Sequence, residues 1–154
     1  MEIGDLLKPE ALKIVSTVSS KKMLLHAISE FAEQVHGLDA AQTLQALQTR
    51  EALGPTGVGH GVAIPHARIA GLEGVVSVFV RLDKPIDFGA VDRKPVDLFF
   101  GLFAPEEAGV EHLKALALIS RTMRDNSICA KLRANDDAET LHAILTELPR
   151  QQAA

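Results

Sequence analysis

The sequence predicts an α/β domain in which a sheet is sandwiched between layers of helices. Two observations support this fold class. Apolar residues recur at helical spacing in the first and last thirds of the chain, whereas β-branched and aromatic runs occupy the middle. Glycine and proline concentrate among those runs, between residues 54 and 109. Because helices precede and follow a strand-rich centre, they are expected to cover both faces of the sheet.

The first half of the chain is predicted to be mainly helical. Apolar residues at helical spacing over residues 24–35 indicate one helix, which Gly37 is expected to terminate. Asp39 is expected to cap a second helix that runs to about Arg50, before Gly54-Pro55 ends it.

Three apolar runs in the middle of the chain are predicted to be strands. They are Val62 to Ile64, Val75 to Leu82 and Val96 to Phe103. The last two are apolar enough to lie near the centre of a sheet that is covered on both sides. Residues 83–95, which contain two prolines and a glycine, are predicted to be a loop with a short extended piece.

The last third is predicted to form three helices, which begin near Val110, before Ile128 and at Asp136. The inward face of the first is predicted to consist of Val110, Leu113, Leu116, Ala117 and Ser120. The inward face of the third is predicted to consist of Leu141, Ile144, Leu145 and Leu148.

Composition places the chain among soluble globular proteins. Hydrophobic residues make up 47% and charged residues 23%. No apolar run approaches the ~20 residues that a membrane span needs, and the first residues lack the pattern of a signal peptide. Cys129 is the only cysteine, so a reducing, cytoplasmic location is expected. The formal net charge of −4, without a concentrated basic face, argues against a nucleic-acid partner or an anionic membrane.

The segment from residue 50 to residue 69, REALGPTGVGHGVAIPHARI, carries the densest glycines of the chain. They fall at nearly every second position, which lets a backbone pass close to another group. A tight surface turn has the same composition. The segment is not a nucleotide loop, because it lacks both G-x-x-x-x-G-K-[ST] and a G-x-G-x-x-G between a strand and a helix.

His66 follows this glycine cluster and is the first candidate nucleophile. Pro65 is expected to end the preceding strand, and it biases Ile64 toward an extended conformation. His66 would then sit at a strand terminus on a stiff backbone, as in-line group transfer requires. A histidine that merely ends a strand fits the same pattern.

Three further kinds of side chain are candidates for the same site. His112 lies in the first turn of a predicted helix, where free N–H groups favour a phosphoryl group, although a surface histidine is equally compatible. Arg50 and Arg68 flank the glycine-rich segment and are suited to pair with phosphate oxygens. His60 lies within the glycine loop and is a candidate accessory residue.

Rival chemistries are poorly supported. The chain lacks the cysteines of a structural zinc site, the H-E-x-x-H of a zinc protease and the G-x-S-x-G of a serine hydrolase. Cys129 lies on an apolar helical stretch, as a core thiol does. A hydrolase using His60, His66 and His112 would lack a carboxylate at ligand spacing. No metal and no cofactor are therefore expected.

The run TREALGPTGVGHGVAIPHARI closely resembles the phosphorylation-site segment of enzyme IIA domains of the mannitol/fructose class, in the bacterial phosphoenolpyruvate-dependent phosphotransferase system. The later runs PVDLFFGLFAP and EHLKALALISRTMRD are similar to the central strand and following helix of that family. The resemblance covers residues 5–147 and implies a single enzyme IIA domain. It also implies a mixed, largely antiparallel sheet between two helical layers.

Carried over to this sequence, the resemblance implies a phosphocarrier. His66 would be phosphorylated on Nε2, His112 would hydrogen-bond the phosphoryl group, and Arg50 would neutralise its charge. The backbone amides of a phosphoryl-stabilising loop would come from Thr56, Gly57, Gly59 and Gly61. Pro55 and His60 depart from the commonest form of the motif, which affects loop geometry and the choice of partner.

The resemblance also implies partners. The donor would be a small histidine phosphocarrier protein. The segment GVAIPHARI and the solitary domain resemble the nitrogen-regulatory branch, whose phosphorylation state is read by regulated target proteins. The alternative is a fructose- or mannitol-type component that passes phosphate to an enzyme IIB. A third alternative is a non-catalytic binding module, against which the presence of His66 argues.

Overall fold

The computed structural model describes the backbone of residues 1–153 and the side chains of residues 1–147 and 149. In chain order, the elements are α1 (Ile3–Leu6), a 3-10 turn (Pro9–Ala11), β1 (Leu12–Val15), α2 (Lys21–His36), α3 (Ala40–Leu53), β2 (Gly57–Gly59), β3 (Val62–Ala63), β4 (His66–Ile69), β5 (Val76–Ile86), β6 (Val96–Pro105), α4 (Val110–Met123), α5 (Asn126–Ala134) and α6 (Ala138–Ala153).

The strands form one mixed sheet in the order β1-β5-β6-β3-β2, with β4 also paired to β6. The predicted mixed sheet is confirmed, but its directions are more evenly divided than the expected, largely antiparallel arrangement. Among the described strands, β5 with β6 and β2 with β3 are antiparallel, whereas β1 with β5, β3 with β6 and β4 with β6 are parallel. Two of the parallel pairings arise at Pro65. This proline divides one extended segment into β3 and β4, and because the chain does not reverse there, both strands run parallel to β6.

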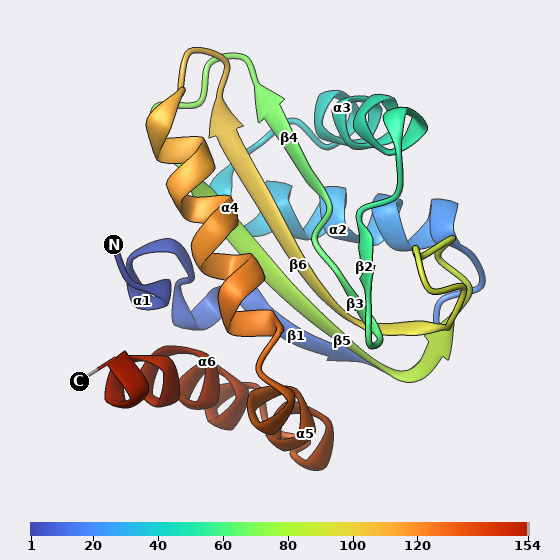
Figure 1. Cartoon of the computed structure of the whole chain (residues 1–154). Helices are drawn as coiled ribbons and strands as arrows, with labels where there is room; N and C mark the ends of the chain where they lie inside the picture. The colour runs from blue at the N-terminus through green and yellow to red at the C-terminus, as the bar shows by residue number, and fades with distance from the viewer. Residues whose placement is uncertain (154) are drawn as a thin grey trace.

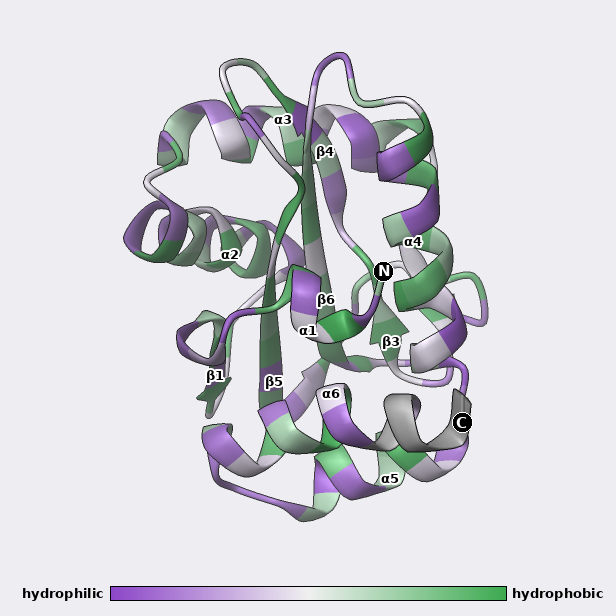
Figure 2. Ribbon diagram, turned by 90° about the vertical axis from the view of Figure 1, so that its left-hand side faces the viewer, coloured by the Kyte–Doolittle hydropathy of each residue, from purple (hydrophilic) through white to green (hydrophobic). Residues whose placement is uncertain are grey.

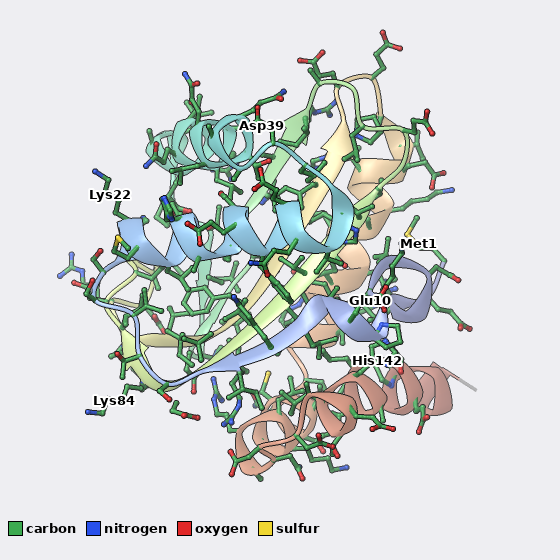
Figure 3. All side chains as sticks on the ribbon, turned by 180° about the vertical axis from the view of Figure 1, so that it is seen from behind. Met1, Glu10, Lys22, Asp39, Lys84 and His142 are labelled. Atoms are coloured by element: carbon green, nitrogen blue, oxygen red, sulfur yellow. The ribbon has the colours of Figure 1, made fainter. Side chains whose placement is uncertain are left out.

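Helices cover both faces of this sheet, as the sequence predicts. In Figure 1, α4 crosses in front of the strands and α2 lies behind them. Figure 2 shows the strands edge-on, with α2 and α3 on one side and α4 and α5 on the other. Seen from behind, α2 spans the strands between Lys22 and the turn that leads to Asp39 (Figure 3).

The core lies around β5 and β6, which are buried along most of their length. Such strands are apolar on both faces because both faces are covered. Two edge-to-face aromatic pairs fill the core: Phe79 with Phe100 at 5.7 Å and Phe88 with Phe99 at 5.2 Å between ring centroids. Phe88 belongs to the predicted loop, so this loop is folded into the core.

The two predicted helices of the first half are confirmed at their ends. Ser20 caps α2 by accepting a hydrogen bond from the Met23 amide at 3.1 Å, and Gly37 ends it with a φ of 72°. Asp39 caps α3 by accepting from the amides of Ala41 and Gln42.

Other elements differ from the prediction. The strands β1, β2 and β4 were not predicted, because three or four residues are too few to show alternation. The strand β5 continues to Ile86, beyond the predicted end at Leu82. Among residues 1–153, no helix is both long enough and apolar enough to cross a bilayer.

The inward face predicted for α4 is wrong. Val110 and Leu113 are 62% and 64% exposed. The buried residues of this helix are instead His112, Ala115, Ile119, Thr122 and Met123. Apolar residues lie on several sides of α4, so hydrophobic periodicity does not fix its orientation. In α6, Leu141, Ile144 and Leu145 are buried as predicted, and the side chain of Leu148 lies outside the described residues.

Candidate functional site

His66 begins β4, immediately after Pro65, and does not end the preceding strand as expected. The two residues before it are held by backbone hydrogen bonds. The Pro65 carbonyl accepts a hydrogen bond from the Leu102 amide at 2.9 Å, and the Ile64 amide donates to Thr56 O at 2.9 Å. The half-buried imidazole therefore projects from a backbone that is fixed on its N-terminal side.

The tautomer of His66 follows from its hydrogen bonds. Nδ1 lies 2.8 Å from the Ile64 carbonyl oxygen, which can only accept, so Nδ1 carries the proton. Nε2 accordingly has a free lone pair. Arg50, in the last turn of α3, donates from Nε to this lone pair at 3.3 Å and from Nη1 to Gly54 O at 2.9 Å.

His112 lies in the first turn of α4 with its ring edge-on to that of His66. The ring centroids are 5.8 Å apart and the interplanar angle is 71°. His112 is only 6% exposed, and among the described residues its Nδ1 has no hydrogen-bond partner. This nitrogen is enclosed, so the ring meets the cavity through its other atoms.

Both imidazoles are kept neutral. Burial lowers the pKa of His66, the hydrogen bond to Ile64 opposes this shift, the Arg50 charge lowers the pKa further and the Glu51 charge raises it. Burial also lowers the pKa of His112, a protonated His66 would lower it further, and the Arg68 charge acts in the same direction. A neutral His66 retains the Nε2 lone pair that nucleophilic attack requires.

These side chains meet in one cavity of about 610 Å³, lined by residues of α3, β4 and the first turn of α4. His66, His112, Arg50 and Arg68 all line it. Arg68 is partly engaged, because its Nη1 donates to Glu106 O at 2.9 Å. The structure thus brings together four residues that the sequence analysis singled out separately.

The glycine loop does not line this cavity. The backbone amides that were expected to stabilise a phosphoryl group therefore lie outside it. Thr56, Gly57, Gly59 and Gly61 are outside the residues that line the cavity. The Thr56 amide donates to Glu51 Oε2 at 2.9 Å. A Cβ on Gly57 would lie 2.8 Å from that of Ala90, so this glycine allows the hairpin to pass against the loop between β5 and β6.

His60 lies at the tip of the same hairpin and is likewise outside the cavity. It adopts a positive φ of 58°, and its carbonyl accepts from Arg133 of α5 at 2.9 Å. Gly61, with a φ of 77°, leaves room for the Arg133 guanidinium. The glycine spacing therefore serves the packing of a β-hairpin against α5.

One side of the cavity was not predicted from the sequence. It is a face of α3 formed by Gln42, Gln45, Ala46, Thr49 and Leu53. These positions lie three or four residues apart and on the same face of the helix as Arg50, so their spacing could have indicated that they line the same site. Within the described part of the chain, no group of three histidine, cysteine, aspartate or glutamate side chains is arranged to hold a metal ion.

A family model described as "Phosphoenolpyruvate-dependent sugar phosphotransferase system, EIIA 2" matches residues 5–148. The chain belongs to this enzyme IIA family.

Relatives of this enzyme IIA chain carry two kinds of name. A nitrogen regulatory protein of Bradyrhizobium diazoefficiens is 47% identical, and the match covers the whole of both chains. A fructose-specific EIIA component of Haloferax volcanii is 36% identical over 76% of this chain and 75% of its own. The crystal structure of nitrogen regulatory protein IIA-Ntr from Neisseria meningitidis superposes with a TM-score of 0.86 and 39% identity, covering 94% of this chain and 99% of that chain.

Proposed function

We propose that this enzyme IIA chain accepts a phosphoryl group on Nε2 of His66 from the phosphohistidine of a small carrier protein. One observation carries the proposal: the Nδ1 proton is bound to Ile64 O. This bond leaves Nε2 as the nucleophilic nitrogen, in a cavity that also holds His112 and Arg50. Family membership supports the same role.

The transfer can be written with bonds and charges balanced. The Nε2 lone pair forms the new P–N bond, the donor's P–N bond breaks, and its electron pair returns to the donor imidazole. Charge in the transition state lies on the three equatorial phosphoryl oxygens. Arg50 is positioned to neutralise it, and His112 offers a buried ring to hydrogen-bond it. The proton of His66 stays on Nδ1 throughout and remains hydrogen-bonded to the Ile64 carbonyl oxygen.

The surface around the cavity supports a protein as the donor. Leu53, which lines the cavity, is 81% exposed, and Val110 and Leu113, which flank His112 in sequence, are 62% and 64% exposed. Large exposed apolar side chains beside a reactive group are typical of protein docking surfaces. A donor that inserts its phosphohistidine would cover these side chains.

The regulatory branch is the proposed physiological role, in which target proteins distinguish the phosphorylated from the unphosphorylated form. The full-length match to a nitrogen regulatory protein supports it. The fructose-specific relative supports a second candidate, a sugar-uptake component that passes phosphate to an enzyme IIB. Adding a fructose-type enzyme IIB to the phosphorylated chain separates them, since rapid loss of phosphate is expected only for the second.

The decisive test of the carrier role is the intact mass of the protein after incubation with phosphoenolpyruvate, enzyme I and the small carrier. The wild type is expected to gain one acid-labile, base-stable phosphate and His66→Ala none. His60→Ala is a matched control that should label normally, because His60 lies outside the cavity. Absence of added mass in the wild type with donor chains of both the sugar and the nitrogen type would overturn the proposal.

A further inference from the structure

The carboxylate of Glu51, beside Arg50 in the last turn of α3, is almost completely enclosed. Its side chain is 6% exposed. It accepts hydrogen bonds from the Thr56 amide at 2.9 Å and from the Thr56 hydroxyl. Lys21, at the start of α2, donates to it at 3.0 Å. Both carboxylate oxygens are therefore engaged, and the buried charge is paired.

A continuous series of hydrogen bonds leads from this carboxylate to the nucleophile. Glu51 holds Thr56, and the Thr56 carbonyl accepts from the Ile64 amide at 2.9 Å. The Ile64 carbonyl then accepts from His66 Nδ1 at 2.8 Å. The position of the Ile64 carbonyl, which selects the tautomer of His66, thus depends on Thr56 and through it on Glu51.

The same residue also controls the arginine. The Gly54 amide donates to Glu51 O at 3.2 Å, which closes the end of α3. The Gly54 carbonyl in turn accepts from Arg50 Nη1 at 2.9 Å. The side chain and the backbone of Glu51 therefore fix the connection between α3 and β2 from which the guanidinium is held against His66.

We propose that Glu51 is a positioning residue for phosphoryl transfer, acting through Thr56 and Ile64 on the His66 tautomer and through Gly54 on Arg50. The reaction it serves rests on the proposed function. Lys21 neutralises the carboxylate of Glu51. Without this ion pair, the negative charge of Glu51 would repel an incoming phosphoryl group. The Lys21 ammonium also lies 4.8 Å from the centroid of the Phe88 ring, which anchors the ion pair to the core.

Only an acceptor with two oxygens suits this position. Thr56 presents two donors, N–H and O–H, and Lys21 presents a third. In Glu51→Gln, an amide NH2 would face one of these donors, leaving it unpaired. In Thr56→Val, the hydroxyl is lost at nearly constant volume. Thr56→Ser keeps the hydroxyl and serves as the rescuing variant.

Nitrogen-15 NMR of the His66 ring tests the positioning without any donor protein. The wild type and Thr56→Ser are expected to show the Nδ1–H tautomer, and Glu51→Gln and Thr56→Val a mixture with Nε2–H. Thr43→Val is the matched control. Thr43 is a buried threonine of α3, the helix that carries Glu51, and within the described residues its hydroxyl has no partner. An unchanged tautomer in folded Glu51→Gln and Thr56→Val would overturn the inference.

Single-turnover transfer from the phosphorylated carrier is the second measurement. Glu51→Gln and Thr56→Val are expected to slow the transfer step about tenfold, as misplacement of reacting groups does, with the donor concentration for half-maximal rate nearly unchanged. A lower Tm with a wild-type rate would assign Glu51 a purely structural role. Should Glu51→Gln fail to fold, Thr56→Val and Lys21→Met decide the question.

The measurements distinguish failure of the phosphocarrier role from failure of the positioning role of Glu51. If the wild type accepts no phosphate but the tautomer changes in Glu51→Gln, the positioning role stands and the phosphocarrier role is wrong. If phosphate is accepted normally by every variant and the tautomer is constant, the carrier role stands and the positioning role is wrong.

Discussion

Two hydrogen bonds determine which ring nitrogen of His66 carries the proton. His66 Nδ1 donates to Ile64 O, and Nε2 accepts from Arg50. Neither bond is visible in the sequence, where His66 is only a histidine after a proline. The motif around His66 predicts it as the phosphorylated residue, and the hydrogen bonds add which of its nitrogens would react.

His112 is expected to assist the transfer without receiving the phosphate. In His112→Ala, the phosphoryl oxygens lose a buried hydrogen-bonding partner, and loss of such a partner typically slows a reaction about a hundredfold or more. Rapid-quench measurement of phosphate transfer checks this rate. His66→Ala should show no transfer at all, so complete loss in both variants would contradict the separate roles.

The pH dependence of acceptance follows from the lowered pKa of His66. Protonation of Nε2 removes the lone pair, so the rate must fall as the pH decreases. Because burial and the Arg50 charge disfavour the imidazolium, this fall is expected at a pH below the value of about 6.5 that is typical of an unperturbed histidine. Single-turnover rates across that range provide the measurement, with a pH-insensitive donor as control. A midpoint above the usual value would show that the site favours the charged ring.

At the scale of elements, α4 combines a buried histidine with exposed apolar neighbours. Hydrophobic periodicity assigned Val110 and Leu113 to the core, and the structure exposes both of them to solvent. The error has a physical source: periodicity measures where apolar residues are, not whether a core or a partner covers them. An apolar face reserved for a protein partner looks the same in a sequence as a core face.

Leu113→Glu is expected to weaken donor docking and leave the fold intact. Leu113 is 64% exposed, so its replacement removes little buried area. The concentration of donor that gives half-maximal transfer should rise several-fold, while Tm stays close to that of the wild type. Ala117→Ser, an exposed change one turn further along α4, is the control. Unaltered donor dependence would exclude this part of α4 from the docking surface.

The long elements and the enzyme IIA family could be predicted from the sequence, whereas the geometry of the site could not. Helices with clear caps, such as those begun by Ser20 and Asp39, were placed correctly. The glycine loop was assigned to the phosphoryl group, yet its glycines serve the packing of β2 and β3. Closely spaced glycines indicate that the backbone passes close to another group. They do not indicate whether that group is a ligand or another part of the same protein.

At the scale of the whole molecule, the site is assembled from distant parts of the chain. Arg50 comes from α3, His66 from β4 and His112 from α4. They meet because β4 pairs with β6 and the helices flank it (Figure 1). No local pattern encodes this meeting, which depends on the sheet order, and so only recognition of the family anticipated it.

The core pair Phe88–Phe99 ties the loop between β5 and β6 to the sheet. Both rings are fully buried, so Phe99→Ala is expected to lower the free energy of unfolding by about 3–5 kcal/mol. Equilibrium unfolding in urea measures this change. Val91→Ala, at an exposed position of the same loop, should stay within about 0.5 kcal/mol of the wild type. A similarly small change for Phe99→Ala would show that the contact between Phe88 and Phe99 contributes little to the cooperative core.

The bond from Arg50 to His66 also means that the Nε2 lone pair is already engaged. It can accept one bond, and in this structure it accepts from the guanidinium. On the proposed function, a phosphoryl group bonded to Nε2 would displace the guanidinium, and Arg50 would then pair with the phosphoryl oxygens. The phosphorylated and unphosphorylated forms would therefore differ in the position of a side chain that belongs to the last turn of α3.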